Sequence, residues 1–266
     1  MKTLRGALLA LLAIVLTPPT VADDQAIAGL FARAGRDGTM VISPLAEGPT
    51  FIYNAPRAQH RFSPASTFKI LNSLIALEER AIAGKDEVLK WDGHSYDYPD
   101  WNRDQTLASA FRVSCVWCYQ ELARRIGAPR YRDYLHRAAY GELREPFNET
   151  TFWLDGSLTV NALEQIEFLK QVYRRSLPFS AASYDTLRDI MLVETTPTYR
   201  IRAKTGWTGR AQPSIGWYVG YVERGDAVWF FATNLDLPDK QDLPLRQGLT
   251  REALRLKGII DGESRE

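Results

Sequence analysis

Hydrophobic positions divide the chain into strand-forming ends and a helix-forming middle. Near the start, short apolar runs over Thr39–Ser43 and Thr50–Asn54, separated by a turn containing Pro and Gly, predict a hairpin at the edge of a sheet. Near the end, three β-branched and aromatic runs, with a turn at Gly225-Asp226, predict an antiparallel meander. These runs are Arg200–Thr205, Ile215–Glu223 and Ala227–Asn234.

The middle of the chain repeats apolar residues at three- and four-residue steps, which is typical of helices. In Ser63–Glu79 the repeat is apolar enough to predict a buried helix, whereas the aromatic, Asp- and Gly-rich stretch Asp92–Asn102 predicts a loop. Strands at both ends and helices between them predict an α+β fold, with an antiparallel sheet built from both termini and a helical lobe from the middle. The other predicted helices are Asp24–Ala34, Leu107–Gly127, Pro129–Tyr140, Leu163–Tyr173, Ser183–Met191 and Thr250–Leu256.

The first 22 residues differ from the rest of the chain. Lys2 and Arg5 precede the unbroken apolar run Ala7–Leu16, and Thr20–Ala22 offers a small-x-Ala cleavage site, so we predict a signal peptide over residues 1–22. A permanent membrane anchor is the alternative, but this run is about half of the roughly 20 residues that a spanning helix needs. We therefore expect a single catalytic domain over residues 23–266, located in a bacterial periplasm.

Composition adds limits on the partner. The 266 residues are 45% hydrophobic and 24% charged, as in an ordinary globular protein, with a formal net charge of +1. Acidic and basic residues are interspersed, so the sequence shows no basic cluster of the kind that binds nucleic acid or an anionic membrane. A small-molecule partner fits better, and assembly as a homodimer is compatible with the sequence.

Cys115 and Cys118 are the only two cysteines, and their C-x-x-C spacing raises a redox or a zinc interpretation. A structural zinc site needs four ligands, and the three histidines are scattered, so no metal site is predicted. A redox motif would open a helix beside a βαβ unit, which the pattern does not contain. We interpret the pair as small apolar residues within a helix, which an oxidising compartment would allow to bond.

The segment Ser63–Lys69 has the pattern S-x-x-K at a predicted helix start. Ser63 is a suitable N-cap and Pro64 a suitable first residue, which places Ser66 in the first turn, where free backbone N–H groups gather. Lys69 lies one turn on, in an otherwise apolar helix, and burial would lower its pKa toward that of a useful base. Serine needs such a neighbouring base to become a nucleophile. Alone, the pattern is equally explained by a capping serine and a surface lysine.

Two further motifs strengthen the interpretation of Ser66 as a nucleophile. Lys204-Thr205-Gly206 ends a predicted strand, where a cation, a hydroxyl and a glycine can hold a substrate carboxylate beside the backbone. Ser114, with Val116 two residues on, places a hydroxyl on a predicted helix where it can relay protons. Read separately these are a turn and a helix serine; together, S-x-x-K, S-x-V and K-T-G follow the order used by penicillin-recognising serine enzymes.

Within that superfamily the chain resembles class D β-lactamases, the oxacillinase type. The similar blocks include the nucleophile segment and the later stretches Lys90–Gly93, Trp101–Asp104, Gln120–Gly127, Phe152–Leu154 and Gly156–Leu158. The resemblance implies the penicillin-recognising fold and hydrolysis of β-lactam antibiotics through an acyl-enzyme on Ser66. It further implies that Lys69 carries a carbamate formed with CO2, and no other cofactor.

Residue by residue, the resemblance assigns further roles. Trp153 matches the tryptophan that hydrogen-bonds the carbamate, and Val116 the apolar residue beside it that limits water. The backbone N–H groups of Ser66 and Trp207 match an oxyanion hole, and Ser114 matches the relay that protonates the leaving nitrogen. The substrate-binding positions are Lys204, Thr205, Gly206, Trp207, Arg246, Val116 and Leu154, of which Lys204, Thr205 and Arg246 match the grip on the substrate carboxylate.

Some positions depart from the family pattern. Glu142 replaces the asparagine expected after Tyr140-Gly141, which predicts a carboxylate close to the site and a structural role for Tyr140. Trp117 replaces the proline that commonly follows S-x-V.

Three alternatives stay open. A penicillin-sensing receptor domain would stay acylated, and a transpeptidase or carboxypeptidase would act on D-alanyl-D-alanine. A redox protein built on Cys115 and Cys118 would tolerate Ser66→Ala and lose activity in Cys115→Ser.

Overall fold

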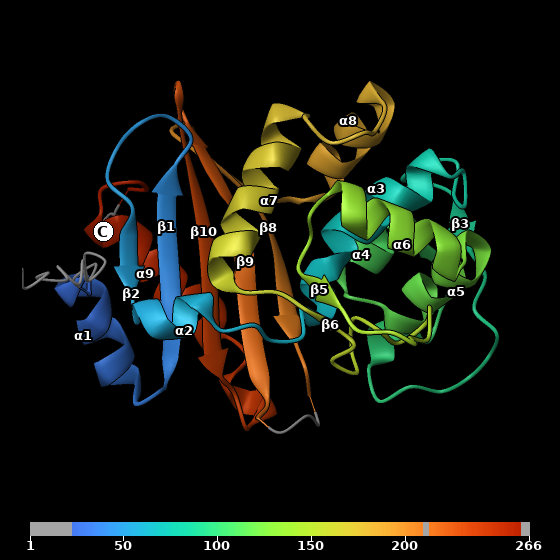
Figure 1. Ribbon diagram of the computed structural model, residues 1–266, viewed down its shortest axis with the longest axis horizontal. Helices are drawn as coiled ribbons and strands as arrows, with labels where there is room; N and C mark the ends of the chain where they lie inside the picture. The colour runs from blue at the N-terminus through green and yellow to red at the C-terminus, as the bar shows by residue number, and fades with distance from the viewer. Residues whose placement is uncertain (1–22, 210–212, 262–266) are drawn as a thin grey trace, which may run out of the picture.

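A six-stranded antiparallel sheet forms the centre of the protein (Figure 1). The computed structural model describes residues 23–209 and 213–261. The strand order is β2, β1, β10, β9, β8, β7, so strands from both ends of the sequence meet in the middle of the sheet. The bounds are β1 Gly38–Pro44, β2 Phe51–Tyr53, β7 Leu192–Thr195, β8 Arg200–Trp207, β9 Ile215–Arg224 and β10 Ala227–Asp236.

Alternation along the strands gives the sheet two apolar faces. In β1, Met40 and Ile42 join the buried cluster that includes α1 (Gln25–Ala34) and α9 (Leu245–Leu256), while Val41 joins the cluster of the helical lobe. α7 (Ala162–Arg174) packs on the lobe side, against β1, β9 and β10. The sheet is therefore a layer between two terminal helices and the lobe (Figure 1).

The lobe is built from the middle of the sequence, as predicted. Its short helices surround a buried helix, α3, and two small two-stranded sheets join its loops. Its elements are α2 Ala55–Gln59, η1 Ala65–Phe68, α3 Lys69–Glu78, β3 Val88–Leu89, η2 Pro99–Trp101, β4 Gln105–Thr106, α4 Leu107–Arg112, α5 Val116–Ile126, α6 Ala128–Arg137, β5 Glu142–Leu143, β6 Leu158–Thr159 and α8 Ala181–Ile190; a last short turn, η3 Lys240–Asp242, precedes α9.

The α+β class, the edge hairpin and the meander β8–β9–β10 are confirmed. The predicted helix over Leu107–Gly127 is wrong, because the structure breaks it into α4 and α5 around Val113–Cys115. The final helix starts at Leu245 rather than at Thr250, and the four-residue strand β7 was not predicted.

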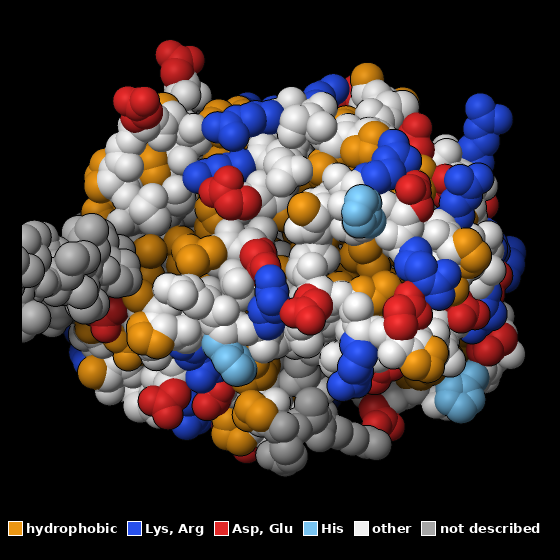
Figure 2. All heavy atoms as spheres, viewed as in Figure 1, with side chains coloured by type: hydrophobic (Ala, Val, Ile, Leu, Met, Phe, Trp, Pro, Cys, Tyr) orange, Lys and Arg blue, Asp and Glu red, His pale blue; other side chains and the backbone are white. Residues whose placement is uncertain are grey.

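The surface carries charges of both signs side by side (Figure 2). Arg61, for example, pairs with both Glu142 and Glu164. Among the residues described, no helix is both long enough and apolar enough to cross a membrane. The predicted signal peptide over residues 1–22 lies outside the described residues.

Candidate active site

Ser66 and Lys69 meet where a 3₁₀ turn passes into α3. The start of this helical segment differs from the expectation, because the 3₁₀ turn η1 begins after Pro64 and Ser63 is therefore not the N-cap. The Ser63 hydroxyl instead donates to the Trp153 carbonyl at 2.8 Å. Lys69 begins α3, and its Nζ donates to Ser66 Oγ at 3.0 Å. A residue three positions on thus faces the serine hydroxyl, as the S-x-x-K spacing predicted.

Lys69 is completely buried, and this burial accounts for its lowered pKa. Burial removes the water that would stabilise an ammonium ion and lowers the pKa of Lys69 to about 7. Its Nζ lies 4.9 Å from the ring centre of Tyr119, and no carboxylate contributes to its pKa. A substantial share of the amine is consequently neutral near pH 7, where it can accept a proton from Ser66.

Ser114 reaches the site from the break between two helices. Its backbone has a φ of +57°, so the chain turns sharply after α4 and α5 starts anew at Val116, with Cys115 as the N-cap. This corrects the prediction of a helical Ser114. Lys204 Nζ donates a hydrogen bond to Ser114 Oγ, which joins the break to the sheet.

Lys204 and Thr205 lie on an open part of β8. Among the described strands, β7 pairs with β8 only as far as Arg202, so Lys204–Trp207 has a strand neighbour only in β9. Lys204 Nζ also donates to the Thr205 carbonyl at 2.9 Å. Burial, followed by repulsion from Lys69 and Arg246, lowers the pKa of Lys204 well below its usual value.

Gly206 allows β8 to approach the turn that contains Ser66. A Cβ at this position would lie 3.0 Å from the Pro64 carbonyl oxygen and 3.1 Å from the Thr67 methyl carbon, which is closer than real side chains normally pack. Trp207, the next residue, lines the same pocket as Ser66. The third residue of K-T-G is thus explained by close packing.

Arg246 enters from the first turn of α9. Its Nη1 donates to the Gly206 carbonyl at 2.7 Å and its Nε to the Leu243 carbonyl at 2.8 Å, so the guanidinium is fixed at the end of β8. Burial lowers the pKa of Arg246 to about 10, which leaves it cationic at neutral pH. The positive charge of Arg246 makes this end of β8 receptive to an anion.

A pocket of about 160 Å³ gathers most of the predicted residues. Its lining includes Ser66, Ser114, Val116, Leu154, Thr205, Gly206, Trp207 and Arg246. Four further lining residues, Tyr98, Trp101, Val113 and Leu243, were not predicted as site residues, although the first two stand in the aromatic loop noted in the sequence.

Trp153 does not line the pocket, and its side chain has an unsatisfied donor among the described residues. The side chain is fully buried, its ring stacks on Phe68 with centroids 5.7 Å apart, and Phe68 directly precedes Lys69. Within the described structure, its indole Nε1 has no hydrogen-bond partner. Buried donors are normally paired, so this N–H provides a place for an acceptor.

The two residues that depart from the family pattern, Glu142 and Trp117, do not line the pocket. Glu142 is exposed, pairs with Arg61 at 2.9 Å and does not line the pocket, which contradicts the expectation of a carboxylate close to the site. Tyr140 is buried, and its hydroxyl lies 3.4 Å from Gln165 Oε1. Trp117 donates from its Nε1 to the Trp101 carbonyl at 2.9 Å.

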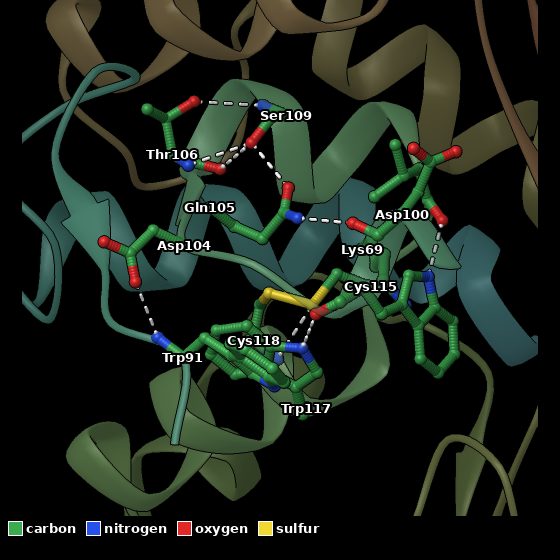
Figure 3. Close-up of a disulfide and its surroundings, with 12 residues drawn as sticks. Lys69, Trp91, Asp100, Asp104, Gln105, Thr106, Ser109, Cys115, Trp117 and Cys118 are labelled. Carbon is green, nitrogen blue, oxygen red and sulfur yellow. Dashed lines mark hydrogen bonds between the residues drawn. A yellow bond between two sulfur atoms is a disulfide. The ribbon is translucent and has the colours of Figure 1, made fainter. Parts of the chain in front are cut away.

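Cys115 and Cys118 form a disulfide at the start of α5 (Figure 3). The sequence left open whether the two cysteines are linked, and the structure shows that they are. Only Cys118 lies within a helix, because Cys115 is the N-cap of α5 and the bond spans the first turn. Both residues are fully buried, which leaves neither sulfur accessible for exchange with another protein and argues against the redox-protein alternative.

Comparison with known proteins defines the class first. Residues 33–255 match the family model described as the penicillin binding protein transpeptidase domain. This match covers most of the chain, including the Ser66 turn and the strand β8 that packs against it. The fold is that of penicillin-recognising serine enzymes.

More similar relatives narrow the family. The chain is 40% identical to β-lactamase OXA-48 of Klebsiella pneumoniae, over 98% of this chain and 100% of that protein. It is 42% identical to β-lactamase OXA-20 of Pseudomonas aeruginosa, over 77% of this chain and 76% of that protein. The crystal structure of the class D β-lactamase YbXI from Nostoc matches with a TM-score of 0.86 at 41% identity, covering 88% of this chain and 99% of that one. The chain belongs to the class D, OXA-type β-lactamases.

Proposed function

We propose that this protein hydrolyses β-lactam antibiotics by acyl transfer from Ser66 to water and thereby confers resistance to them. The observation that carries the proposal is the fully buried Lys69 amine 3.0 Å from the hydroxyl of Ser66, which lines a pocket together with Arg246. A family relationship over most of the chain supports the same reaction.

In acylation, Lys69 removes the proton from Ser66 Oγ, and Oγ attacks the carbonyl carbon of the four-membered ring. The oxyanion that forms is placed beside the backbone N–H groups of Ser66 and Trp207, each worth on the order of 10²–10³ in rate. When the C–N bond breaks, the ring nitrogen takes a proton from Ser114, which the Lys204 ammonium can resupply. Before deacylation, the proton that Lys69 took from Ser66 passes to Lys204, which has lost one. Lys69 then removes a proton from water as the water attacks the ester, and this proton goes to Ser66 Oγ as the ester bond breaks.

Lys69 is proposed to react with CO2 to form a carbamate. Two features of the site fit this group. Among the described residues, the indole N–H of Trp153 has no partner and offers a donor. Repulsion from Lys69 contributes to the lowered pKa of Lys204, and a negative charge on Lys69 would replace that repulsion by attraction. A carbamate supplies a base that serves both half-reactions. Within this scheme Trp153 holds the base, while Val116 and Leu154 restrict water from the apolar side of the pocket.

Activity should be lost at acid pH and restored by bicarbonate. Because burial lowers the pKa of Lys69 to about 7, the amine becomes protonated as the pH falls through 7, and a protonated amine neither reacts with CO2 nor accepts the Ser66 proton. Turnover measured against pH, with and without added bicarbonate, should show an acid limb that moves to lower pH when bicarbonate is present. Identical profiles in both conditions would contradict the carbamate.

Arg246→Ala should weaken substrates that bear a carboxylate. A buried charge-assisted contact contributes about 1.5–3 kcal/mol, so kcat/KM for benzylpenicillin should fall by about 10- to 10²-fold, mainly through KM. Arg251→Ala is the matched control, because Arg251 is on the same helix but pairs with Glu194. Equal kinetics for wild type and Arg246→Ala would remove Arg246 from the binding site.

Residues 1–22 are proposed to direct export to the periplasm and to be cleaved. The basic start, the apolar run and the small residues before Asp23 support this, and the Cys115–Cys118 disulfide suits an oxidising compartment. Protein isolated from a periplasmic fraction should begin near Asp23. An intact Met1 terminus on membrane-bound protein would favour a permanent anchor instead.

A further inference from the structure

The break between α4 and α5 places three pocket residues in an unusual backbone. Val113, Ser114 and Val116 all line the pocket, and Ser114 has a φ of +57°. Residues with a Cβ rarely adopt this left-handed conformation, and the sequence has no glycine between Leu107 and Ile126 that would favour it. Contacts with neighbouring parts of the chain must therefore hold the turn.

The disulfide is the covalent part of that restraint. Cys115 directly follows Ser114, and its bond to Cys118 closes the first turn of α5 from inside the core (Figure 3). The Cys118 N–H also donates to Cys115 Sγ at 3.2 Å, so the sulfur acts as the helix cap. The cross-link therefore joins the N-cap of α5 to its first turn, one residue after Ser114.

Two tryptophans hold the other side of the same turn. Trp101 donates from Nε1 to the Val113 carbonyl at 3.0 Å, and Trp117 donates from Nε1 to the Trp101 carbonyl at 2.9 Å. Cys118 is followed by Tyr119, whose ring lies under the Lys69 ammonium. The start of α5 therefore adjoins both Lys69 and the Lys204 contact of Ser114.

We propose that the Cys115–Cys118 disulfide is a positioning element for β-lactam acylation: it holds Ser114 in its left-handed conformation, with Oγ against Lys204. This inference rests on the proposed function. Because both sulfurs are buried, the bond acts through geometry and takes no part in electron transfer during turnover.

The step affected follows from the proton route. In acylation the proton on Ser114 Oγ passes to the ring nitrogen as the C–N bond breaks, and the Lys204 ammonium replaces it. Deacylation has no leaving nitrogen, because water attacks the ester and the proton returns to Ser66 Oγ. A displaced Ser114 should therefore slow acylation and leave deacylation nearly unchanged, which a general loss of structure would not do.

The variant that isolates the cross-link is Cys115→Ser combined with Cys118→Ala. Serine is a favourable N-cap, so the start of α5 keeps a capping oxygen while the covalent tie is lost. Single-turnover acylation by benzylpenicillin should slow by about 10-fold or more, since misplacing a reacting group by about 1 Å costs on the order of 10²-fold. The deacylation rate of the pre-formed acyl-enzyme should stay within about 2-fold of wild type.

A double-mutant cycle with Ser114→Ala tests the route through Ser114. With Ser114 absent, removing the disulfide should slow acylation no further, because both changes act on the same proton. Leu122→Ala is the control for destabilisation alone, because Leu122 is buried on α5 and does not line the pocket. It should lower Tm and keep wild-type acylation. Wild-type protein refolded with a reductant present provides a second test if the cysteine variant does not fold.

The outcomes separate the two proposals. If wild type shows no turnover, the proposed function fails. If wild type turns over and the cysteine double variant acylates equally fast, or if its effect adds fully to that of Ser114→Ala, the positioning role is overturned. Slower acylation, unchanged deacylation and non-additivity together would support it.

Discussion

Ser66→Ala is expected to abolish β-lactam turnover, with a fall in kcat on the order of 10⁶-fold, as loss of the nucleophile produces in serine hydrolases. Among the residues that the structure describes, only the Ser66 hydroxyl both lines the pocket and lies 3.0 Å from the Lys69 amine. Ring opening of benzylpenicillin, followed by absorbance, and intact protein mass measure the loss. The variant should show neither hydrolysis nor a covalent adduct.

Ser183→Ala is the matched control for this result. Ser183 is also buried, but it lies on α8 and bonds to Glu78, outside the pocket lining. Its replacement should leave turnover unchanged and lower stability by about 1 kcal/mol through the lost hydrogen bond. Substantial hydrolysis by Ser66→Ala would remove the nucleophile from the mechanism.

Lys69→Ala is expected to have the second largest effect, because the same side chain serves both half-reactions. General base catalysis contributes about 10²–10⁴-fold to a single step. Acylation should slow by this range, and any acyl-enzyme that forms should persist, because the water that would release it has no base. Mass spectrometry after long incubation with benzylpenicillin should show a lasting adduct on Ser66 together with negligible turnover.

Lys85→Ala controls for the loss of one lysine. Lys85 is on the surface and pairs with Asp189, so its removal should not change either rate. Rapid deacylation in Lys69→Ala would contradict the role of Lys69 as base, and no amount of bicarbonate should rescue that variant.

The sequence alone predicts the parts of this site that regular secondary structure positions. Ser66 and Lys69 are three residues apart in a helical segment, so their contact follows from local geometry. Lys204–Gly206 stands on a strand whose β-branched and aromatic pattern is strong. The edge hairpin and the meander follow from the same alternation, because each strand buries its side chains on the two faces of the sheet.

The parts that the sequence did not predict depend on contacts between distant segments. Apolar residues recur at helical spacing from Leu107 to Ile126 without glycine or proline, so the sequence predicts one helix there. The chain nevertheless turns at Ser114, where contacts of Trp101 and the disulfide hold the turn. Glu142 was expected near the site because it follows Tyr140-Gly141 in the sequence. Instead, its side chain is exposed and forms an ion pair with Arg61. The pocket residues Tyr98 and Leu243 come from a loop and from the approach to α9, where periodicity carries no information.

The most direct test of the central claim is to mix purified protein with excess benzylpenicillin and bicarbonate, and to follow ring opening and intact protein mass in the same sample. We predict many ring openings per protein, with the mass returning to that of the free enzyme once substrate is consumed. One ring opening per protein, with a lasting adduct on Ser66, would contradict hydrolysis and indicate a sensor or a transpeptidase.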